Sequence, residues 1–450
     1  MFQILLKKTL IHLSKKNPRD IIFDTLYAFF SDKKSLKILI TKYIKDETSY
    51  TDKAFILNIV KGVVRDKRIL DENIYQYSKF KKIDARTLTL LYIGTYQLLF
   101  CDSVPDYASI NTTVELSKRK HKKSFNFINA ILRKISKSAL KKTDQLKTNR
   151  PEIYFSYPDW ILNKIRRLYD NKLYSICESS SNIPPIWIRI NAFKTNLAEL
   201  SQILIKNNIS FSEDKLLSNY IKIDKFDSKN IILDLIKKGF IYIQNPSSGL
   251  VVNLLSPSKN DTILDACSAP GGKAAFIAEL NGGGANLTCL DINKKRINQI
   301  KSNFSIMGIK DTSFICEDSI RFRANKKYNK ILLDLPCSSS GTIRKNPDIK
   351  WTLSKNSLKN IQKTQYDILN NMKNNLAKKG EIIYSTCSIF NDENHKNIER
   401  FIAENDDFHI SKINNKNIPE NFINELGGIT ILPDENGYEG MFAIKIKKNV

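Results

Sequence analysis

The sequence predicts a multidomain protein, with an all-α N-terminal domain, a small α+β middle module and a C-terminal α/β domain built on a Rossmann-like, open parallel sheet. Three observations lead to this prediction. The chain has 450 residues and is 42% hydrophobic, which is enough for two or three separate cores. Its first third carries apolar residues at helical spacing. Its last part alternates short apolar runs with helical stretches. We expect the boundaries at 1–140, 141–250 and 251–450.

The N-terminal domain is expected to be helical throughout, because each of its apolar stretches repeats at three- and four-residue intervals. Ser49 and Thr51 can cap the helix that follows them. Residues 109–111 are expected to precede a further helix. The expected helices cover residues 18–30, 35–44, 54–64, 88–100, 112–120 and 125–135.

The formal net charge of +26 indicates a polyanionic partner such as a nucleic acid. Part of this charge can be compositional, because the chain is crowded with Lys, Asn and Ile. A basic run, Lys118, Arg119, Lys120, Lys122 and Lys123, is expected between the last two helices of the N-terminal domain. It is either a solvated loop or a patch that contacts phosphates.

Several classes of protein are disfavoured. No stretch approaches the ~20 consecutive apolar residues of a membrane span, and the first sixteen residues do not form a convincing signal peptide. We therefore expect a cytoplasmic protein without a membrane partner, in which the seven cysteines are free. No CxxC pair occurs and the four His are scattered, so we expect no metal site.

The middle module is expected to follow a linker that begins near residue 141. Residues 187–193 are predicted to form a strand and residues 198–207 a helix, because the first run is short and apolar and the second has helical spacing. Residues 219–224 and 240–245 alternate like strands. This mixture predicts a small α+β fold.

Five strands are predicted in the C-terminal domain, and each ends at or just before a polar residue or a cysteine. Ligands of open parallel sheets bind outside the carboxyl ends of the strands, so these side chains predict a site at one edge. The strands cover residues 262–266, 287–291, 313–317, 330–334 and 381–386, and the residues at their ends are Asp265, Asp291, Asp318, Asp334 and Cys387.

The first of these strands leads into the turn DACSAPGGKA at 265–274, where Gly271 and Gly272 allow a sharp turn close to a ligand. The turn is neither a P-loop nor a GxGxxG turn. Asp291 follows about 20 residues later, where an acid can hold a ribose diol. Asp318 can accept from an exocyclic amine. A nucleoside with an amino-acid tail, S-adenosylmethionine, fits these positions. The alternative is a set of solvent-exposed loop acids.

Two further motifs, DLPCSSSG at 334–341 and STCS at 385–388, make the pattern specific. With DACSAPGGKA, they resemble motifs of the RNA 5-methylcytosine methyltransferases of the NOL1/NOP2/Sun family, which are class I S-adenosylmethionine-dependent enzymes. Residues 104–135 resemble the end of the NusB-like domain that the bacterial members acting on 16S ribosomal RNA carry. Residues 344–351, RKNPDIKW, are similar to their RNA-contacting segment. The resemblance runs over nearly the whole chain and implies 16S ribosomal RNA as the partner of a monomeric enzyme.

The resemblance also implies roles for individual residues. Cys387 attacks carbon 6 of cytosine, Cys337 assists release of the product, and Asp334 hydrogen-bonds the base. The chemistry of the residue itself, rather than the resemblance, suggests that Lys273 can lower a thiolate pKa or orient the base. The cofactor-binding residues are Cys267, Ser268, Ala269, Pro270, Gly271, Gly272, Lys273, Asp291, Asp318 and Asp334. The RNA-binding residues are Lys118, Arg119, Lys120, Arg344, Lys345 and Lys350.

The residues themselves leave alternatives open. Without the resemblance, either Cys337 or Cys387 could be the nucleophile, because DNA cytosine methyltransferases attack from a Pro-Cys motif. The same chemistry could act on transfer RNA or DNA, although Cys337 after Pro336 disfavours amino-methylating enzymes. A non-catalytic RNA-binding factor is the other alternative, and Cys387 and Asp334 argue against it.

Two positions depart from the family pattern. Asn245 stands where the family usually has Asp, and residues 439–442 read Glu-Gly-Met-Phe in place of Asp-Gly-Phe-Phe. The remaining cysteines are expected to fill cores, and Cys267 to pack inward from the cofactor turn. The expected core cysteines are Cys101, Cys177, Cys289 and Cys316.

Overall fold

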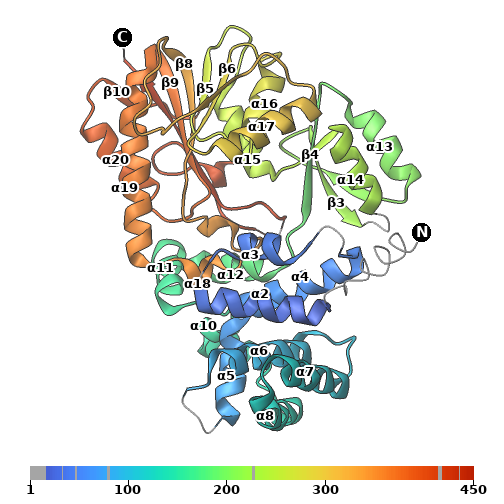
Figure 1. Cartoon of the computed structure of the whole chain (residues 1–450). Coiled ribbons are helices and arrows are strands. Elements are labelled where there is room, and N and C mark those ends of the chain that lie inside the picture. The colour runs from blue at the N-terminus through green and yellow to red at the C-terminus, as the bar shows by residue number, and fades with distance from the viewer. Residues whose placement is uncertain are drawn as a thin grey trace, which may run out of the picture. The chain divides into compact units, whose positions relative to one another are not determined.

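The structure is a computed structural model that describes residues 17–32, 34–45, 48–78, 82–225, 229–413, 418–434 and 436–449. The chain divides into two compact units. The first comprises Met1–Arg166 and Asn346–Thr352, and the second comprises Arg167–Lys345 and Leu353–Val450 (Figure 1). No helix of the described residues is long and apolar enough to cross a membrane.

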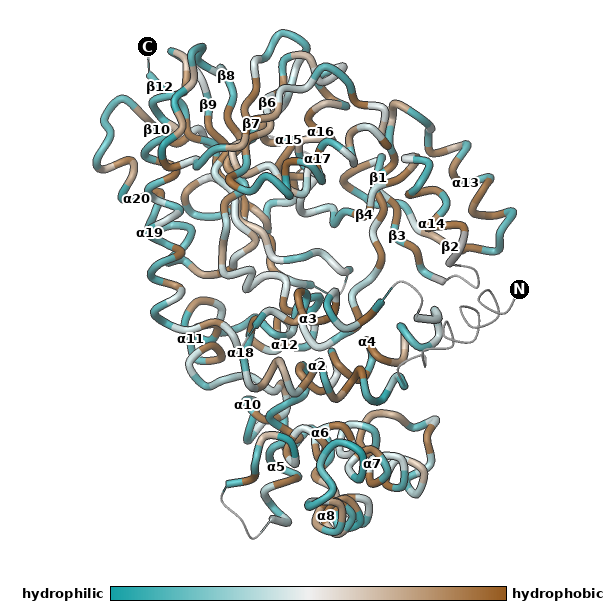
Figure 2. Tube along the Cα trace, in the orientation of Figure 1, coloured by the Kyte–Doolittle hydropathy of each residue, from teal (hydrophilic) through white to brown (hydrophobic). Residues whose placement is uncertain are grey.

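The first unit is helical. Its central helix, α6, buries Leu90, Leu91 and Ile93 in a core to which α2, α4 and α8 contribute. Figure 2 shows hydrophobic segments along α2 and α4, as the apolar spacing of both helices predicts. The helices are α2 (Pro18–Asp32), α3 (Leu36–Tyr43), α4 (Tyr50–Arg65), α5 (Lys67–Tyr77), α6 (Ala85–Phe100), α7 (Asp106–Lys120), α8 (Phe125–Ser138), α9 (Asp144–Asn149), α10 (Pro151–Tyr154) and α11 (Asp159–Tyr169), which continues into the second unit.

The helices predicted for this unit are confirmed, with three corrections of detail. Ser49 caps α4 by accepting from the Asp52 amide, whereas Thr51 lies inside the helix. Residues 109–111 lie inside α7, which begins at Asp106. The basic run is not a loop between helices: Lys118–Lys120 form the last turn of α7, and the next two lysines lie in the 3₁₀ turn η1 (Lys122–Ser124). Cations favour a helix C-terminus because of its partial negative charge.

One short segment joins the first unit although the sequence around it belongs to the C-terminal sheet. Residues 346–352, which include α18 (Ile349–Thr352), pack within the first unit. The Trp351 indole donates to the Val64 carbonyl (2.6 Å), and the Lys350 ammonium donates to the carbonyls of Arg65 (2.7 Å) and Phe155 (3.2 Å). No pattern in the sequence marks this excursion.

The second unit contains a four-stranded antiparallel sheet with the order β2-β3-β1-β4. The predicted strands and helix of this module are confirmed. The core joins Ile188 and Ile221 of the sheet to Leu200 and Leu204 of α13. Strand β2 and helix α14 were not predicted from the sequence. The elements are α12 (Leu173–Ser181), β1 (Ile186–Ile190), α13 (Leu197–Lys206), β2 (Ser210–Glu213), β3 (Tyr220–Lys225), α14 (Lys229–Lys238) and β4 (Ile241–Ile243).

The larger sheet of this unit has the order β10-β12-β9-β8-β5-β6-β7, and β11 also pairs with β12. The five predicted strands, β5 to β9, are parallel, which confirms the α/β fold class. The antiparallel strands were not predicted from the sequence, and one of them, β12, pairs with β9 through residues such as Ile444 and Tyr384. The strands are β5 (Ile263–Asp265), β6 (Leu287–Asp291), β7 (Ser313–Cys316), β8 (Tyr328–Asp334), β9 (Leu376–Thr386), β10 (Phe408–Ile410), β11 (Ile429–Ile431) and β12 (Met441–Lys448).

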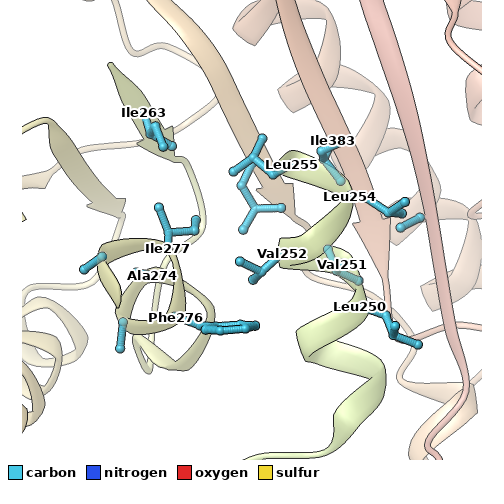
Figure 3. Close-up of a cluster of buried hydrophobic side chains, with 14 of the residues drawn as sticks. Leu250, Val251, Val252, Leu254, Leu255, Ile263, Ala274, Phe276, Ile277 and Ile383 are labelled. Atoms are coloured by element: carbon cyan, nitrogen blue, oxygen red, sulfur yellow. The ribbon is translucent and has the colours of Figure 1, made fainter. Parts of the chain in front are cut away.

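Helices cover both faces of this sheet. On one face, Ile263 and Ile383 pack against α15 (Pro246–Leu255), α16 (Gly272–Leu280) and α17 (Lys294–Met307). Figure 3 shows Phe276 of α16 turned toward α15, and Ile383 beside Leu254 and Leu255. The alternate residues of the strands pack with α19 (Lys355–Met372) and α20 (His395–Ala403). Because both faces are covered, the carboxyl ends of the strands remain as the place for a ligand.

Candidate active site

The glycine turn after β5 is held in a shape that side chains would disturb. Gly271 has φ +96° and caps α16, and a Cβ there would lie 2.9 Å from Ile300 of α17. A Cβ on Gly272 would lie 2.8 Å from the Tyr242 ring. The turn closes with a hydrogen bond from the Gly271 amide to the Ser268 carbonyl (2.8 Å). Backbone amides at this helix N-terminus can therefore approach an anion or a carboxylate closely.

Asp291, at the end of β6, links the turn to the next strand. Its side chain is 3% exposed and accepts from the amides of Asn293 (3.0 Å) and Ala269 (3.4 Å). Arg296 lies 3.5 Å from the same carboxylate. Asp318 is half-buried just beyond β7 and accepts from the Ile320 amide (3.0 Å). Both predicted acids thus follow neighbouring parallel strands.

Asp265 is a site residue that the sequence marked only as the end of a strand. Its side chain is 1% exposed, and neither carboxylate oxygen has a partner with hydrogen-bond geometry among the described residues. Burial raises the pKa of this carboxyl to about 7, and the negative charge of Asp334 adds to the shift. A buried carboxyl without a partner is suited to a ligand that brings an ammonium group.

An ion pair lies between the glycine turn and the two cysteine loops, which are the segment after β8 that contains Cys337 and the segment after β9 that contains Cys387. The Lys273 ammonium is 2.7 Å from the Asp334 carboxylate, which also accepts from the Ser385 hydroxyl (3.3 Å). Burial opposes the charge of Lys273, but Asp334 outweighs it and raises the pKa of the ammonium, with a further contribution from Cys387. Lys273 therefore stays charged beside both Asp334 and the thiol of Cys387.

The two cysteines of the predicted mechanism lie side by side. Cys337 follows β8 and Cys387 follows β9, and their Sγ atoms are 2.9 Å apart. The Ser339 hydroxyl lies 3.3 Å from the Cys387 sulfur. The hydrogen bond with Cys387 raises the pKa of Cys337 well above its usual range, and burial and the charges of Cys387 and Glu393 act in the same direction. Cys337 therefore holds its proton.

The predicted RNA contacts lie in different environments. Arg344 is buried and donates to the backbone carbonyls of Ser179 and Asp434. Lys350 is 1% exposed and bonded to backbone carbonyls of the first unit. These positions argue against direct phosphate contacts by either side chain. Lys345 is exposed, with its ammonium 3.9 Å from Glu439.

The basic residues of α7 are engaged in ion pairs at the surface. Lys118 pairs with Glu115 (2.6 Å), Arg119 with Asp20 (3.6 Å) and Lys120 with Asp24 (2.8 Å). The Lys118–Glu115 pair is exposed on both sides, and a pair of that kind is worth little, whereas Lys120, Asp24 and Asp20 are half-buried. Contact between these residues and RNA stays a prediction.

The other cysteines are only partly as expected. Cys177 and Cys289 are buried and Cys101 is half-buried. Cys316 was expected in a core but is exposed at the end of β7, where its thiol donates to the Ile292 carbonyl (3.6 Å). This expectation was wrong because the strand ends there and the helices no longer cover it. Burial raises the pKa of Cys267 to about 12, which makes a reactive thiolate at that position unfavourable.

The structure explains the first departure from the family pattern, Asn245, and nothing in it explains Glu439 or Met441 in the second. Asn245 donates to the Gly437 carbonyl (2.8 Å) and accepts from the amides of Ser247 and Glu439 (3.1 Å each). An ionised aspartate could accept from both amides but could not donate to Gly437. Asn245 therefore fastens the start of α15 to the segment before β12.

Gly440, which follows Glu439, is hydrogen-bonded to the two cysteine loops through Gly341. The Gly440 amide donates to the Gly341 carbonyl (2.8 Å), and the Gly341 amide donates to the Cys387 carbonyl (2.9 Å). A Cβ on Gly341 would lie 2.4 Å from the Gly440 oxygen. The backbone contact needs glycine at 341, and it joins both cysteine loops to the start of β12.

A sheet of this order, a glycine turn, acidic strand ends and a pair of thiols define a methyltransferase of the S-adenosylmethionine-dependent α/β class. Residues 252–447 match the family model described as 16S rRNA methyltransferase RsmB/F. Residues 16–137 match the NusB family, and residues 157–228 match the ferredoxin-like domain of RsmF/B-like methyltransferases. Together these matches confirm the resemblance of the motifs to the RsmB/F 16S rRNA methyltransferases, with a NusB domain in front.

Individual relatives agree over nearly the full length. The probable ribosomal RNA small subunit methyltransferase B of Bacillus subtilis (strain 168) is 29% identical over 97% of this chain and 100% of that protein. The ribosomal RNA small subunit methyltransferase B of Photorhabdus laumondii is 28% identical over 96% of this chain and 99% of that protein. The crystal structure of PH0851 is similar in fold, with a TM-score of 0.79 and 21% identity, and covers 97% of this chain and 100% of that chain.

Proposed function

We propose that this protein methylates carbon 5 of a specific cytosine in 16S ribosomal RNA, with S-adenosylmethionine as methyl donor, through a covalent bond between Cys387 and carbon 6 of the base. The observation that carries the proposal is the pair of neighbouring thiols, 2.9 Å apart at the ends of two parallel strands. The names of the relatives from Bacillus subtilis and Photorhabdus laumondii support small-subunit ribosomal RNA over transfer RNA as the substrate.

The residues of the turn fit the methyl donor, which supplies an electrophilic methyl group when it is bound. The unpartnered carboxyl of Asp265 can accept from its ammonium group, and Asp291 can accept from its ribose hydroxyls. Asp318 can accept from its exocyclic amine. The turn from Cys267 to Lys273 would line the site with backbone amides, and its glycines leave room for close approach.

The chain's own residues can carry out the covalent steps. Asp334, fixed by Lys273, hydrogen-bonds the cytosine near N3 and its amino group, which favours charge uptake as the Cys387 thiolate adds to carbon 6. The electron pair of the broken C5–C6 double bond makes carbon 5 the nucleophile that takes the methyl group. The proton on carbon 5 must then leave, and the S–C6 bond breaks to restore the double bond and the thiolate.

Cys337 is suited to this last stage. The hydrogen bond with Cys387 is the largest cause of its raised pKa, and that cause disappears once Cys387 is bonded to carbon 6. Burial and the charge of Glu393 still raise the pKa of Cys337, so its thiol must first release its own proton to solvent before it can take the proton from carbon 5. We further propose that the enzyme acts as a monomer in the cytoplasm. The paired thiols oppose a purely non-catalytic RNA-binding role.

A denaturing gel with labelled 16S ribosomal RNA tests the assignment. Cys387→Ala should form no covalent complex and no product. Cys337→Ala should transfer the methyl group and then stall as a slow-migrating protein–RNA band, because release is impaired. The reverse pattern would make Cys337 the nucleophile. Normal methylation by both variants would overturn the thiolate mechanism.

The choice of RNA needs a separate measurement. Bisulfite sequencing of ribosomal RNA from a deletion strain should reveal one cytosine in 16S ribosomal RNA that loses its methyl group, restored by the wild-type gene and not by the Cys387→Ala gene. Loss of methylation only in transfer RNA would replace the substrate while keeping the chemistry.

A further inference from the structure

We propose that Glu393 is a positioning residue that sets the geometry of the two cysteine loops, and that it does so by bridging Ser338 and Ser388. The effect on catalysis rests on the function proposed above. The bridge itself rests on contacts within the second unit.

The Glu393 carboxylate is fully buried, at 0% exposure, between the end of β9 and the start of α20. One oxygen accepts from the Ser338 backbone amide (2.8 Å) and from the Gln365 side-chain amide (3.0 Å). The other oxygen accepts from the Ser388 hydroxyl (2.6 Å). Three donors converge on this group, which is the arrangement that an ionised carboxylate needs in the interior.

The positions of the donors show which two segments the Glu393 carboxylate joins. Ser338 directly follows Cys337, and Ser388 directly follows Cys387. One carboxylate therefore holds the residue after each cysteine. The Ser388 oxygen also lies 2.9 Å from the Ser340 hydroxyl, which accepts from the Ile389 amide (3.0 Å). Both loops are joined by this network at their first residues beyond the thiols.

The network is anchored from α19, so it cannot shift freely with the loops. Gln365 is fully buried and donates to the Pro336 carbonyl (3.0 Å) as well as to Glu393. Asn397 of α20 donates to the Gln365 side-chain oxygen (3.3 Å). The residues before and after Cys337 are thus both fixed to the same glutamine–glutamate pair.

A buried carboxylate is a costly way to join two loops if joining them were its only effect. The Glu393 carboxylate also fixes the orientation of the two cysteine loops and places a negative charge beside them. The two sulfurs must meet one base from fixed positions, and a displacement of about 1 Å can lower a rate by a factor of 100. The charge of Glu393 also contributes to the raised pKa of Cys337, after the Cys387 hydrogen bond and burial.

Glu393→Gln tests the bridge, because it keeps the shape and removes one acceptor and the charge. Glu399→Gln is the matched control, since Glu399 is an exposed glutamate on the neighbouring helix α20. We expect kcat for methylation to fall about 10- to 100-fold in Glu393→Gln, with KM for RNA and affinity for S-adenosylmethionine unchanged. The control should match the wild type in every measurement.

Alkylation by iodoacetamide, followed by mass spectrometry in the absence of RNA and cofactor, gives a readout that a merely structural role would not move. In Glu393→Gln, the pH profile of Cys337 alkylation should shift to lower pH, because a nearby negative charge is gone. An unchanged profile together with an unchanged kcat would overturn the proposal, and so would a loss confined to KM.

Ser388→Ala removes one side of the bridge and keeps the test valid if Glu393→Gln does not fold. It should lower kcat without changing KM, and the double variant should be no slower than Glu393→Gln alone. If the fall in kcat of the double variant equals the product of the falls in the two single variants, Glu393 and Ser388 act separately. That result would overturn the bridge. If the alkylation profile shifts but the wild type does not methylate 16S ribosomal RNA, the proposed function fails and the bridge stands.

Discussion

The glycine turn at 265–273 and the basic segment at 344–350 differ in how well their residue types predict the environment of each side chain. In the turn, the predicted residues gather at the ends of parallel strands, and Gly271 has the left-handed φ that its position needs. In the basic segment, Arg344 and Lys350 are buried on backbone carbonyls, and only Lys345 is exposed. Glycines and strand-end acids are constrained by local backbone. A lysine takes its role from the partners that the tertiary structure supplies.

The largest effect that sharpens this contrast is expected at Lys350. Lys350→Ala should destabilise the first unit, because it removes the ammonium that donates to the carbonyls of Arg65 and Phe155, at about 1–3 kcal/mol for a group left unsatisfied. Urea unfolding followed by circular dichroism measures the loss. If the variant is as stable as the wild type but binds RNA more weakly, Lys350 is an RNA contact after all.

Asp291→Ala tests the role predicted for the glycine turn. It removes charge-assisted hydrogen bonds worth about 1.5–3 kcal/mol, so the affinity for S-adenosylmethionine in calorimetry should fall roughly 10- to 150-fold. Asp311→Asn is the control, because Asp311 is exposed beyond α17 at a positive φ that Asn tolerates. Equal affinity in a folded Asp291 variant would remove this residue from the site.

Asp265 gives a pH-dependent prediction. Its folded pKa of about 7 lies above the usual value for an aspartate, so the folded state binds more protons than the unfolded state between those two values. Its stabilising contribution is present at low pH and is lost as the pH rises toward 7. The melting temperature of the wild type, relative to Asp265→Asn, should therefore decrease from pH 4 to pH 7. A constant difference would contradict the raised pKa.

The smallest effect is expected at Lys345. Lys345→Ala should change stability by less than about 0.5 kcal/mol, as an exposed substitution does. If Lys345 contacts a phosphate, the salt dependence of RNA binding should become shallower by about one unit in a plot of log affinity against log salt. An unchanged slope in filter-binding experiments would leave the segment without a direct phosphate contact.

Much of the architecture could be predicted from the sequence because it depends on local periodicity. The helices of the first unit and the parallel strands β5 to β9 carry apolar residues at the spacing of their secondary structure. The strand-end acids followed from the rule that ligands of such sheets bind at the carboxyl edge. The antiparallel strand β12 was missed although its sequence, MFAIKIKK, alternates apolar and polar residues as a strand does.

The parts of the site that escaped prediction depend on burial. In the sequence, Asp265 looks like any other strand-end acid. In the structure, its two carboxylate oxygens have no hydrogen-bond partner among the described residues. Glu393 lies in a polar stretch, NDENHKN, that resembles a solvated helix start, yet it is fully buried. Cys316 looked like a core residue and is exposed. In each case the deciding quantity is what packs against the side chain, which spacing alone does not encode.

The excursion of residues 346–352 into the first unit has a consequence for synthesis on the ribosome. The partners of Trp351 and Lys350, at residues 64, 65 and 155, emerge long before the segment itself, because Arg167–Lys345 must be made in between. At about 5–20 residues per second, this gap lasts roughly 10–40 s. During that time the N-terminal helices lack their last packing element. The order of translation therefore makes completion of the first unit wait for most of the second unit.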